Sequence, residues 1–291
     1  MNSTQFFFRN CIRYRDIATL VAFSGTGYLF SIESISEFNS VRFAASIAGC
    51  ILFIAHVFFY NDYIDDASMP SEKKRRNRHL MKFHFSSHLV LMSVMWLPLG
   101  FSLLFFILLP LNSQFLLLMA WILTFLYSSS STSLKGIPYI SLLVFFGFAI
   151  LFFHAGWVVN RPFNLHSIAW SSFMALILVG GHFFNELEDL ADDLKARRLT
   201  NAIKMGEVNA FKSGLVFFWL ASVLITCYNA FNGPHVELFL SVLLLFSWSI
   251  VAFITHQNGY RTELARFRRL YRGIFAGFLI SMTMVHLYSI F

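Results

Sequence analysis

The stretch RFAASIAGCILFIAHVFFYNDYIDD, residues 42–66, changes character abruptly after Tyr60. Up to this tyrosine the chain is almost continuously apolar, over a length that crosses the hydrocarbon core of a bilayer as a helix. Beyond it, one asparagine and three aspartates follow within six positions. The stretch therefore predicts a transmembrane helix that ends in a group of acidic side chains.

The same pattern recurs along the chain, which has 291 residues, 57% of them apolar and only 13% charged. This composition excludes a water-soluble globule of this length and favours a polytopic membrane protein. Because the runs are continuously apolar, whereas barrel strands would alternate, the predicted fold class is all-α, a nine-helix transmembrane bundle in a single domain over residues 1–291. The predicted spans are residues 17–32, 42–60, 88–109, 112–128, 137–157, 166–184, 211–228, 236–255 and 273–290. The third and fourth spans are also open to interpretation as one re-entrant unit.

The basic residues predict how this bundle is oriented. All Lys and Arg residues except Arg42 and Arg161 fall in the N-terminal tail, in the regions that follow the second, fourth, sixth and eighth spans or, for Lys212, at the very start of the seventh span. The positive-inside rule places these regions, with the N-terminus, on the cytoplasmic side. Since the cations flank membrane spans and form no separate basic domain, nucleic acid is not expected as a partner.

Amide and carboxylate side chains continue the second span at helical spacing. Asn61 and Asp65 are four residues apart, as are Asp62 and Asp66. If the helix continues past the apolar run, each pair lies on one face, one turn apart. Acidic groups at the membrane end of an apolar helix are candidates for a functional site.

The sixth span ends in the same way, with Asn185, Asp189 and Asp193 at intervals of four residues. Like charges one turn apart repel each other unless something positive lies between them. A hard divalent cation with oxygen ligands, Mg²⁺ above all, would relieve that repulsion, and Mg²⁺ completes its coordination shell with substrate phosphates and water. Both acidic stripes therefore predict a Mg²⁺ site.

Basic residues lie in the same regions and could hold phosphate oxygens. They are Lys73, Lys74, Arg76, Arg78, Lys135, Lys195, Arg197 and Arg198. Two Mg²⁺-binding acidic groups with basic loops around them predict a diphosphate site. The alternative, a solvated face with local ion pairs, stays open on this evidence.

Three motifs resemble the signatures of a known family. The first is Asn61-Asp62-Tyr63-Ile64-Asp65, followed by a basic segment and Asn77-Arg78-His79-Leu80; the second runs from Asp189 to Asp193 with Thr200, Ala202 and Gly206; the third is Tyr127-Ser128 with Leu134-Lys135-Gly136 and Pro138. Following the second, sixth and fourth spans respectively, they resemble the UbiA superfamily of intramembrane prenyltransferases over nearly the whole chain. Three positions depart from the family pattern: Met69, His79 and Arg197 stand where Asp, Pro and Gly are usual.

The resemblance implies a UbiA-like transmembrane domain that uses Mg²⁺ to transfer an isoprenyl group from an isoprenyl diphosphate to a small or lipophilic acceptor, with its active site on the cytoplasmic side of the membrane. The implied metal ligands are Asn61, Asp62, Asp65, Asp189 and Asp193. The implied substrate-binding residues are Asn61, Lys74, Arg78, Tyr127, Lys135 and Asn185. Of all these, the residues expected to act in catalysis are Asp62, Asp65, Asp189 and Lys135.

Other functions compete with this one. A membrane terpene cyclase of the same family would share the metal site, and only its pocket would differ. A transporter or a non-catalytic membrane scaffold is the alternative of a different class, although acids on one side of the membrane alone do not suit a translocation path. His182, three residues before Asn185, is either a hydrogen-bonded helix contact or a base that takes the proton of the acceptor.

Overall fold

The computed structural model describes residues 14–66, 88–129, 132–260 and 263–290, and in these ranges it contains helices and no strands. The long helices are α2 (Tyr14–Phe30), α3 (Ser40–Asp66), α5 (His88–Phe106), α6 (Leu111–Ser128), α7 (Ile140–Trp157), α8 (Leu165–Lys195), α10 (Glu207–Asn232), α11 (His235–Gln257) and α12 (Leu264–Ile290). Shorter elements are α9 (Asn201–Met205) and the 3₁₀ helices η1 (Ile35–Glu37) and η2 (Leu134–Gly136). The all-α prediction is confirmed for the described residues.

Each predicted span overlaps one of these long helices. In the described part of the chain, seven of them are long and apolar enough to cross a membrane: α3, α6, α7, α8, α10, α11 and α12. The helix α2 has 17 residues, and in α5 the continuous run of residues whose side chains are described is the shorter apolar stretch Met95–Phe106. A polytopic membrane protein is therefore confirmed, while the predicted count of nine spans is not confirmed by the described residues.

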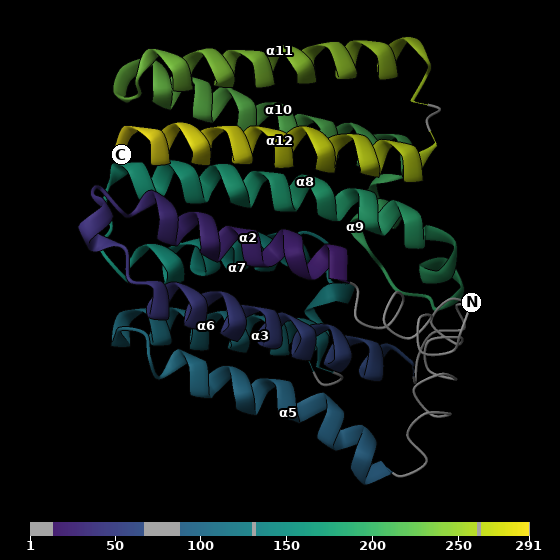
Figure 1. Ribbon diagram of the computed structural model, residues 1–291. Coiled ribbons are helices and arrows are strands. Elements are labelled where there is room, and N and C mark those ends of the chain that lie inside the picture. Colours follow the sequence, from purple (N-terminus) through teal and green to yellow (C-terminus); the bar gives the residue numbers. More distant parts are fainter. Residues whose placement is uncertain (1–13, 67–87, 130–131, 261–262, 291) are drawn as a thin grey trace, which may run out of the picture.

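The helices lie side by side in a stacked bundle (Figure 1). Near its middle, α8 packs against α7 and α10, while α2 packs against α7 and α3. The helices α5 and α11 lie at opposite edges of the bundle. Since α5 packs mainly against α3, whereas α6 packs mainly against α7 and also touches α3, the third and fourth predicted spans are separate helices.

Glycines allow α2 and α7 to cross with their backbones in contact. A Cβ atom at Gly27 would overlap Phe153 O, and a Cβ atom at Gly156 would overlap Ser24 O. Small residues at such crossings are typical of membrane helices, where close packing replaces the hydrophobic effect as the force between helices. The position of α7 relative to α2, and hence of the segment that precedes α7, depends on this contact.

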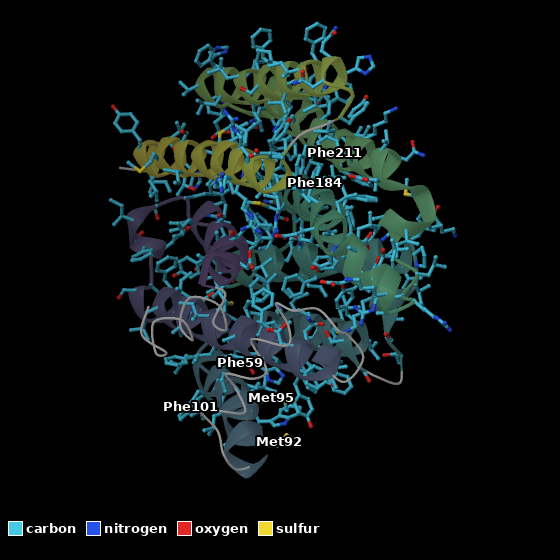
Figure 2. The ribbon with its side chains drawn as sticks, turned by 90° about the vertical axis from the view of Figure 1, so that its right-hand side faces the viewer. Phe59, Met92, Met95, Phe101, Phe184 and Phe211 are labelled. Carbon is cyan, nitrogen blue, oxygen red and sulfur yellow. The ribbon has the colours of Figure 1, made fainter. Side chains whose placement is uncertain are left out.

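Large apolar side chains fill the two halves of the bundle (Figure 2). Phe184 of α8 meets Phe211 of α10 edge-on, with ring centroids 5.2 Å apart. In the other half, the buried Phe59 of α3 packs with the buried Met95 of α5 and with the partly buried Met92. These contacts hold α8 and α3 just before the acidic stripes that the two helices carry.

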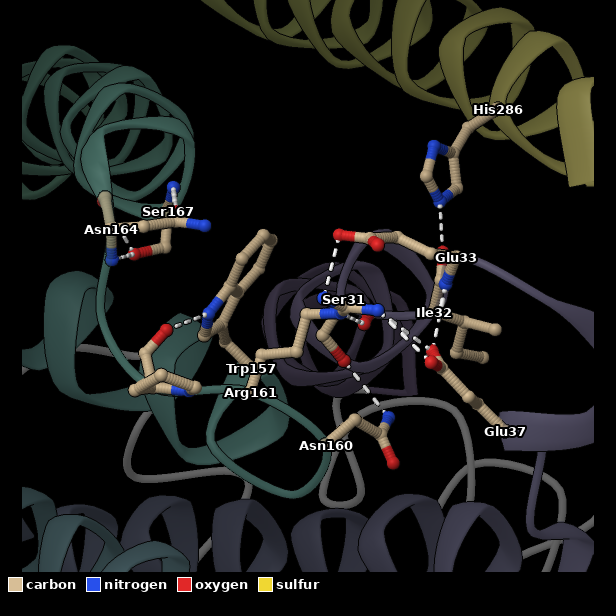
Figure 3. Close-up of polar contacts among 11 residues, drawn as sticks. Ser31, Ile32, Glu33, Glu37, Trp157, Asn160, Arg161, Asn164, Ser167 and His286 are labelled. Carbon is tan, nitrogen blue, oxygen red and sulfur yellow. Dashed lines mark hydrogen bonds and ion pairs between the residues drawn. The ribbon is translucent and has the colours of Figure 1, made fainter.

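Ion pairs join the connections at the end of the bundle opposite to those stripes (Figure 3). Arg161 Nη1 lies 2.7 Å from Glu33 Oε1, and its Nη2 donates to Glu37 Oε1 at 3.0 Å. The Nε2 atom of His286 in α12 lies within hydrogen-bond distance of Ile32 O, at 3.0 Å. The connection between α2 and α3 is thereby tied to the connection between α7 and α8 and to α12.

Candidate functional site

The end of α3 meets the segment that joins α6 to α7. Asn61 Oδ1 accepts hydrogen bonds from Ser128 Oγ at 3.0 Å and from Lys135 Nζ at 3.4 Å. Ser128 is the last residue of α6, and Lys135 lies in η2. The Lys135 residue is 6% exposed, an uncommon environment for a cation, which is costly to bury unless it has polar partners. The fold thus brings the first and third motifs into direct contact.

The second motif forms the end of α8, an unbroken helix of 31 residues. Asn185, Asp189 and Asp193 lie on consecutive turns of one stripe, as their spacing predicts. Asp193 is buried, and the other two are partly buried. The Oδ1 atom of Asn185 is buried and has no hydrogen-bond partner among the described residues. Because an unsatisfied buried acceptor is costly, this atom is suited to a cation or to a donor from a ligand.

Arg198 connects the second motif to the third. Its Nη1 lies 3.7 Å from Asp193 Oδ1, and its backbone N–H donates to Asp193 O at 3.0 Å. Its Cγ lies 3.8 Å from the position that a Cβ atom would take on Gly136, the residue after Lys135. All three motifs therefore gather at one end of the bundle, the end on the right in Figure 1.

The remaining predicted residues of the first motif are placed in part. Asp62 follows Asn61 in α3 and is partly buried. Asp65 lies in the same helix, and its side chain is outside the described part of the structure. Lys74 and Arg78 lie in residues 67–87, outside the described residues.

A buried polar network that the motifs did not predict lies beside the acidic stripe of α8. Glu186 is its centre, with Oε1 3.0 Å from His182 Nε2 and accepting from Asn201 Nδ2 at 2.7 Å. Its Oε2 accepts from the backbone N–H of Ala202 at 2.9 Å. Asn201 lies between Thr200 and Ala202 of the second motif. This position within the motif is the feature of the sequence that could have indicated a role for Asn201.

Aromatic rings cover the other side of this network. The His182 ring stacks on Phe145 with centroids 4.0 Å apart, and Tyr127 approaches the His182 ring edge-on at 6.4 Å. Tyr127 therefore lies beside α8, near the predicted site. His182 Nε2 lies near the Glu186 carboxylate without the geometry of a hydrogen bond, an arrangement that suits a helix contact and a base equally.

A model of the UbiA prenyltransferase family matches residues 20–279. The chain belongs to this family. The match spans the helices from α2 to α12 and includes all three motifs. No curated protein matches the sequence.

Solved structures share the fold at low sequence identity. A UbiA homolog from Archaeoglobus fulgidus bound to GPP and Mg²⁺ has a TM-score of 0.73 at 16% identity, covering 98% of this chain and 99% of that chain. The same homolog bound to DMAPP and Mg²⁺ also has a TM-score of 0.73 at 16% identity, with 98% of each chain covered. A structure of digeranylgeranylglyceryl phosphate synthase has a TM-score of 0.62 at 14% identity, covering 99% of this chain and 100% of that chain.

The departure from the family pattern at Arg197 keeps a backbone shape that glycine usually provides. Arg197 has a φ of 52°, and Ser133 and Tyr139, which flank Lys135 in the sequence, have φ of 42° and 68°. A side chain in this left-handed region costs about 1–2 kcal/mol per residue. Such strain collects at functional sites, where the surrounding contacts enforce it.

The oxygen ligands at this end of the bundle fit a hard cation. The described residues include no group of three or more His, Cys, Asp or Glu side chains that could hold a metal ion by itself. The stripes do supply amide and carboxylate oxygens, and Asn185 Oδ1 is a buried acceptor without a partner in the described part of the chain. Mg²⁺ needs only one or two protein carboxylates when phosphates and water complete its shell. The donor set therefore fits Mg²⁺ that is held jointly with a diphosphate.

Proposed function

We propose that this protein uses Mg²⁺ to transfer an isoprenyl group from an isoprenyl diphosphate to a small or lipophilic acceptor within the membrane. The observation that carries the proposal is the contact of Asn61 with the buried Lys135, at the same end of the bundle as the α8 stripe. Membership of the UbiA prenyltransferase family supports the reaction class, and the GPP and DMAPP bound to the A. fulgidus homolog support the substrate class.

Each motif has a role in this proposal. Asn61, Asp62 and Asp65 from α3, with Asp189 and Asp193 from α8, would hold Mg²⁺. The bound Mg²⁺ would neutralise charge on the diphosphate and make it a better leaving group.

The residues around the metal would bind the substrate. Lys135 would donate to a phosphate oxygen and stabilise the negative charge that develops as the bond to the isoprenyl carbon breaks. Lys74 and Arg78 would add phosphate contacts, while Asn185 and Tyr127 would contact the substrate from α8 and α6.

The isoprenyl chain needs an apolar and dry path, because the allylic cation must meet its acceptor before it meets water. A recess between α3 and α6 begins one residue before Asn61 and is too narrow to hold a water molecule, so an isoprenyl chain would have to part its side chains to enter. It is lined by His56, Val57, Tyr60, Trp121, Thr124 and Phe125. Tyr60 stacks on Phe125 with centroids 5.4 Å apart, and ring faces of this kind stabilise a cation without reacting with it.

We also propose an orientation and an extent for the membrane domain. The N-terminus and the active site would lie on the cytoplasmic side, as the distribution of Lys and Arg predicts. Residues 1–291 would form one UbiA-like transmembrane domain, which is supported by a single main core of buried residues that runs from Ile17 to Met282.

The test is incubation of the purified protein with geranyl, farnesyl and geranylgeranyl diphosphates, in Mg²⁺ or in EDTA, with measurement of released diphosphate. Products are extracted with and without aromatic or lipid acceptors. Lys135→Ala and Asp189→Asn should abolish release, whereas Lys212→Ala should not. Lys212 is a matched control because it is exposed and its Nζ lies over the Tyr260 ring, at 4.8 Å from the ring centroid.

The outcomes separate the competing functions. Mg²⁺-dependent release that requires an acceptor establishes the transferase. Release without any acceptor, giving a cyclic product, would replace the transferase with a cyclase. No release under any condition, together with no Mg²⁺-dependent binding of the diphosphates, would refute the catalytic proposal and leave a transporter or a scaffold.

A further inference from the structure

We propose that Glu186 and Asn201 are positioning residues, which hold the Lys135 segment in register with the acidic stripe of α8. This inference rests on the proposed function, since it concerns how the diphosphate site is assembled. The two residues form a continuous chain of hydrogen bonds from α8 to the backbone that follows Lys135. Neither residue is among the implied ligands of the metal or the substrate.

The first part of this chain is Asn201, which is fully buried. Its Nδ2 donates to Glu186 Oε1 at 2.7 Å and to Ser141 Oγ at 2.8 Å. Its Oδ1 accepts from the backbone N–H of Tyr139 at 2.6 Å. One amide group therefore bridges α8, the first turn of α7 and the residue that precedes α7.

Tyr139 is the point at which this bridge acts on the Lys135 segment. It lies four residues after Lys135 and has a φ of 68° with a ψ of −39°, a positive-φ conformation that a side chain disfavours. Such a conformation persists only when neighbouring contacts enforce it. The hydrogen bond to Asn201 Oδ1 is a contact of this kind, and Lys204 Nζ adds a second one, 4.6 Å from the centroid of the Tyr139 ring.

Glu186 connects the same bridge to the acidic stripe. It follows Asn185 directly in α8, and Asp189 comes three residues later. Its Oε2 accepts from Ala202 N at the start of α9, where the N-cap residue Thr200 makes no side-chain capping bond. The carboxylate is buried and hydrogen-bonded, so a change at Glu186 would be transmitted to α9 and to Asn201 rather than absorbed by solvent.

The functional consequence follows from the geometry of diphosphate binding. Lys135 and the α8 stripe must contact opposite parts of one small head group, and a misplacement of the order of 1 Å at such a site can cost about a hundredfold in rate. Residues that hold the binding groups without touching the ligand typically change affinity or activity by about 10–100-fold when they are removed. Glu186 and Asn201 are placed to do this.

Asn229 provides a matched control for the simpler explanation that any buried asparagine stabilises the bundle. It is 1% exposed, and its Nδ2 donates to Ser241 Oγ at 2.8 Å, joining α10 to α11. Asn201 makes the same type of bond to Ser141 at the same distance. Asn229 belongs to none of the three motifs, so Asn229→Ala should lower stability without a selective effect on the diphosphate site.

The experiment measures inhibition of the prenyltransferase reaction by inorganic diphosphate, with KM for the isoprenyl diphosphate and the thermal unfolding midpoint. Inorganic diphosphate occupies the head-group site alone, so its inhibition constant does not depend on the chain or the acceptor. We expect Asn201→Ala and Glu186→Gln to raise this constant and KM by about tenfold or more. Asn229→Ala should lower the unfolding midpoint about as much as Asn201→Ala does. It should leave the inhibition constant and KM unchanged.

A double variant distinguishes a specific bridge from a general loss of packing. Glu186→Gln combined with Asn201→Asp exchanges amide and carboxylate, so a donor and an acceptor still face each other and the Tyr139 N–H still has an acceptor. The inhibition constant of the double variant should be closer to the value for the unmodified protein than the constants of the two single variants are. This variant also serves if Asn201→Ala cannot be purified in folded form.

Three results would overturn the inference. Inhibition constants for Asn201→Ala and Glu186→Gln equal to that of Asn229→Ala would reduce both residues to general stabilisers. A double variant worse than both single variants would exclude the bridge as the cause. If the unmodified protein neither turns over an isoprenyl diphosphate nor binds inorganic diphosphate, the proposed function fails, and the inference fails with it.

Discussion

The substitution Gly156→Ala should force α2 and α7 apart. A Cβ atom at Gly156 would overlap Ser24 O and lie 2.8 Å from Tyr28 N, whereas ordinary contacts begin at 3.4 Å. The obstructing atoms belong to the backbone of α2, so no side chain can rotate out of the way. Because protein interiors are close-packed, the two helices would have to separate by more than about 1 Å.

The expected loss of stability follows from two opposing effects. Overpacking a well-packed core costs about 1–3 kcal/mol, and an obstacle made of backbone places this substitution near 3 kcal/mol. Alanine has a higher helix propensity than glycine and returns about 1 kcal/mol. The net loss of about 2 kcal/mol should lower the unfolding midpoint of a chain of this size by about 3 °C.

The measurement is thermal unfolding of the detergent-solubilised protein, followed by tryptophan fluorescence. Gly277→Ala is the control, since a Cβ atom at Gly277 in α12 would have no heavy atom within 4 Å beyond its own helix backbone. The control should leave the midpoint unchanged or raise it. A midpoint for Gly156→Ala equal to that of the control would refute the reasoning that backbone contact sets the α2–α7 crossing.

Three further predictions concern the site and the opposite end of the bundle. Arg197→Gly should raise the unfolding midpoint slightly, because it relieves about 1–2 kcal/mol of left-handed strain and loses somewhat less to the flexibility of glycine in the unfolded chain; a lowered midpoint would contradict this. The hydrogen bond from the Glu33 backbone N–H, together with the Arg161 guanidinium, lowers the pKa of Glu37 below its usual 4.5. Its ionised form therefore stabilises the fold above pH 4.5, and this contribution disappears as the pH falls through the lowered pKa, so the midpoints of the unmodified protein and Glu37→Gln should converge in acid; a constant difference at all pH values would disprove it. Mg²⁺ and inorganic diphosphate added together should raise the midpoint of the unmodified protein by mass action, and removal of Mg²⁺ with EDTA or the change Asp189→Asn should cancel the increase; protection that survives both treatments would point to binding elsewhere.

Much of the helical organisation could be predicted from the sequence because it depends on local properties of the chain. Apolar runs of membrane-spanning length predicted where the helices lie, and the spacing of Asn185, Asp189 and Asp193 predicted one stripe on α8. The predicted ends were less accurate. The helices α3 and α8 continue beyond the apolar runs, to Asp66 and Lys195, so their acidic ends are helical as well.

Contacts between helices could not be predicted in the same way. Asn61 and Lys135 are separated by 74 positions, and their hydrogen bond exists because α3, α6 and η2 end at the same place. The role of Asn201 is hidden for the same reason, since its partners are Glu186 on α8 and Tyr139 before α7. A pattern within one segment carries no information about which other segment will lie beside it.

The sequence by itself thus determined a helical membrane protein with two acidic stripes, basic loops and the motifs of its family, because transfer of an apolar segment into lipid and helical spacing are both local. The tertiary structure decided which polar groups share a site and which buried polar groups are hydrogen-bonded to each other. The physical reason is that neighbouring helices are selected by close packing, as at Gly27 and Gly156, where the backbones touch only because neither residue has a side chain.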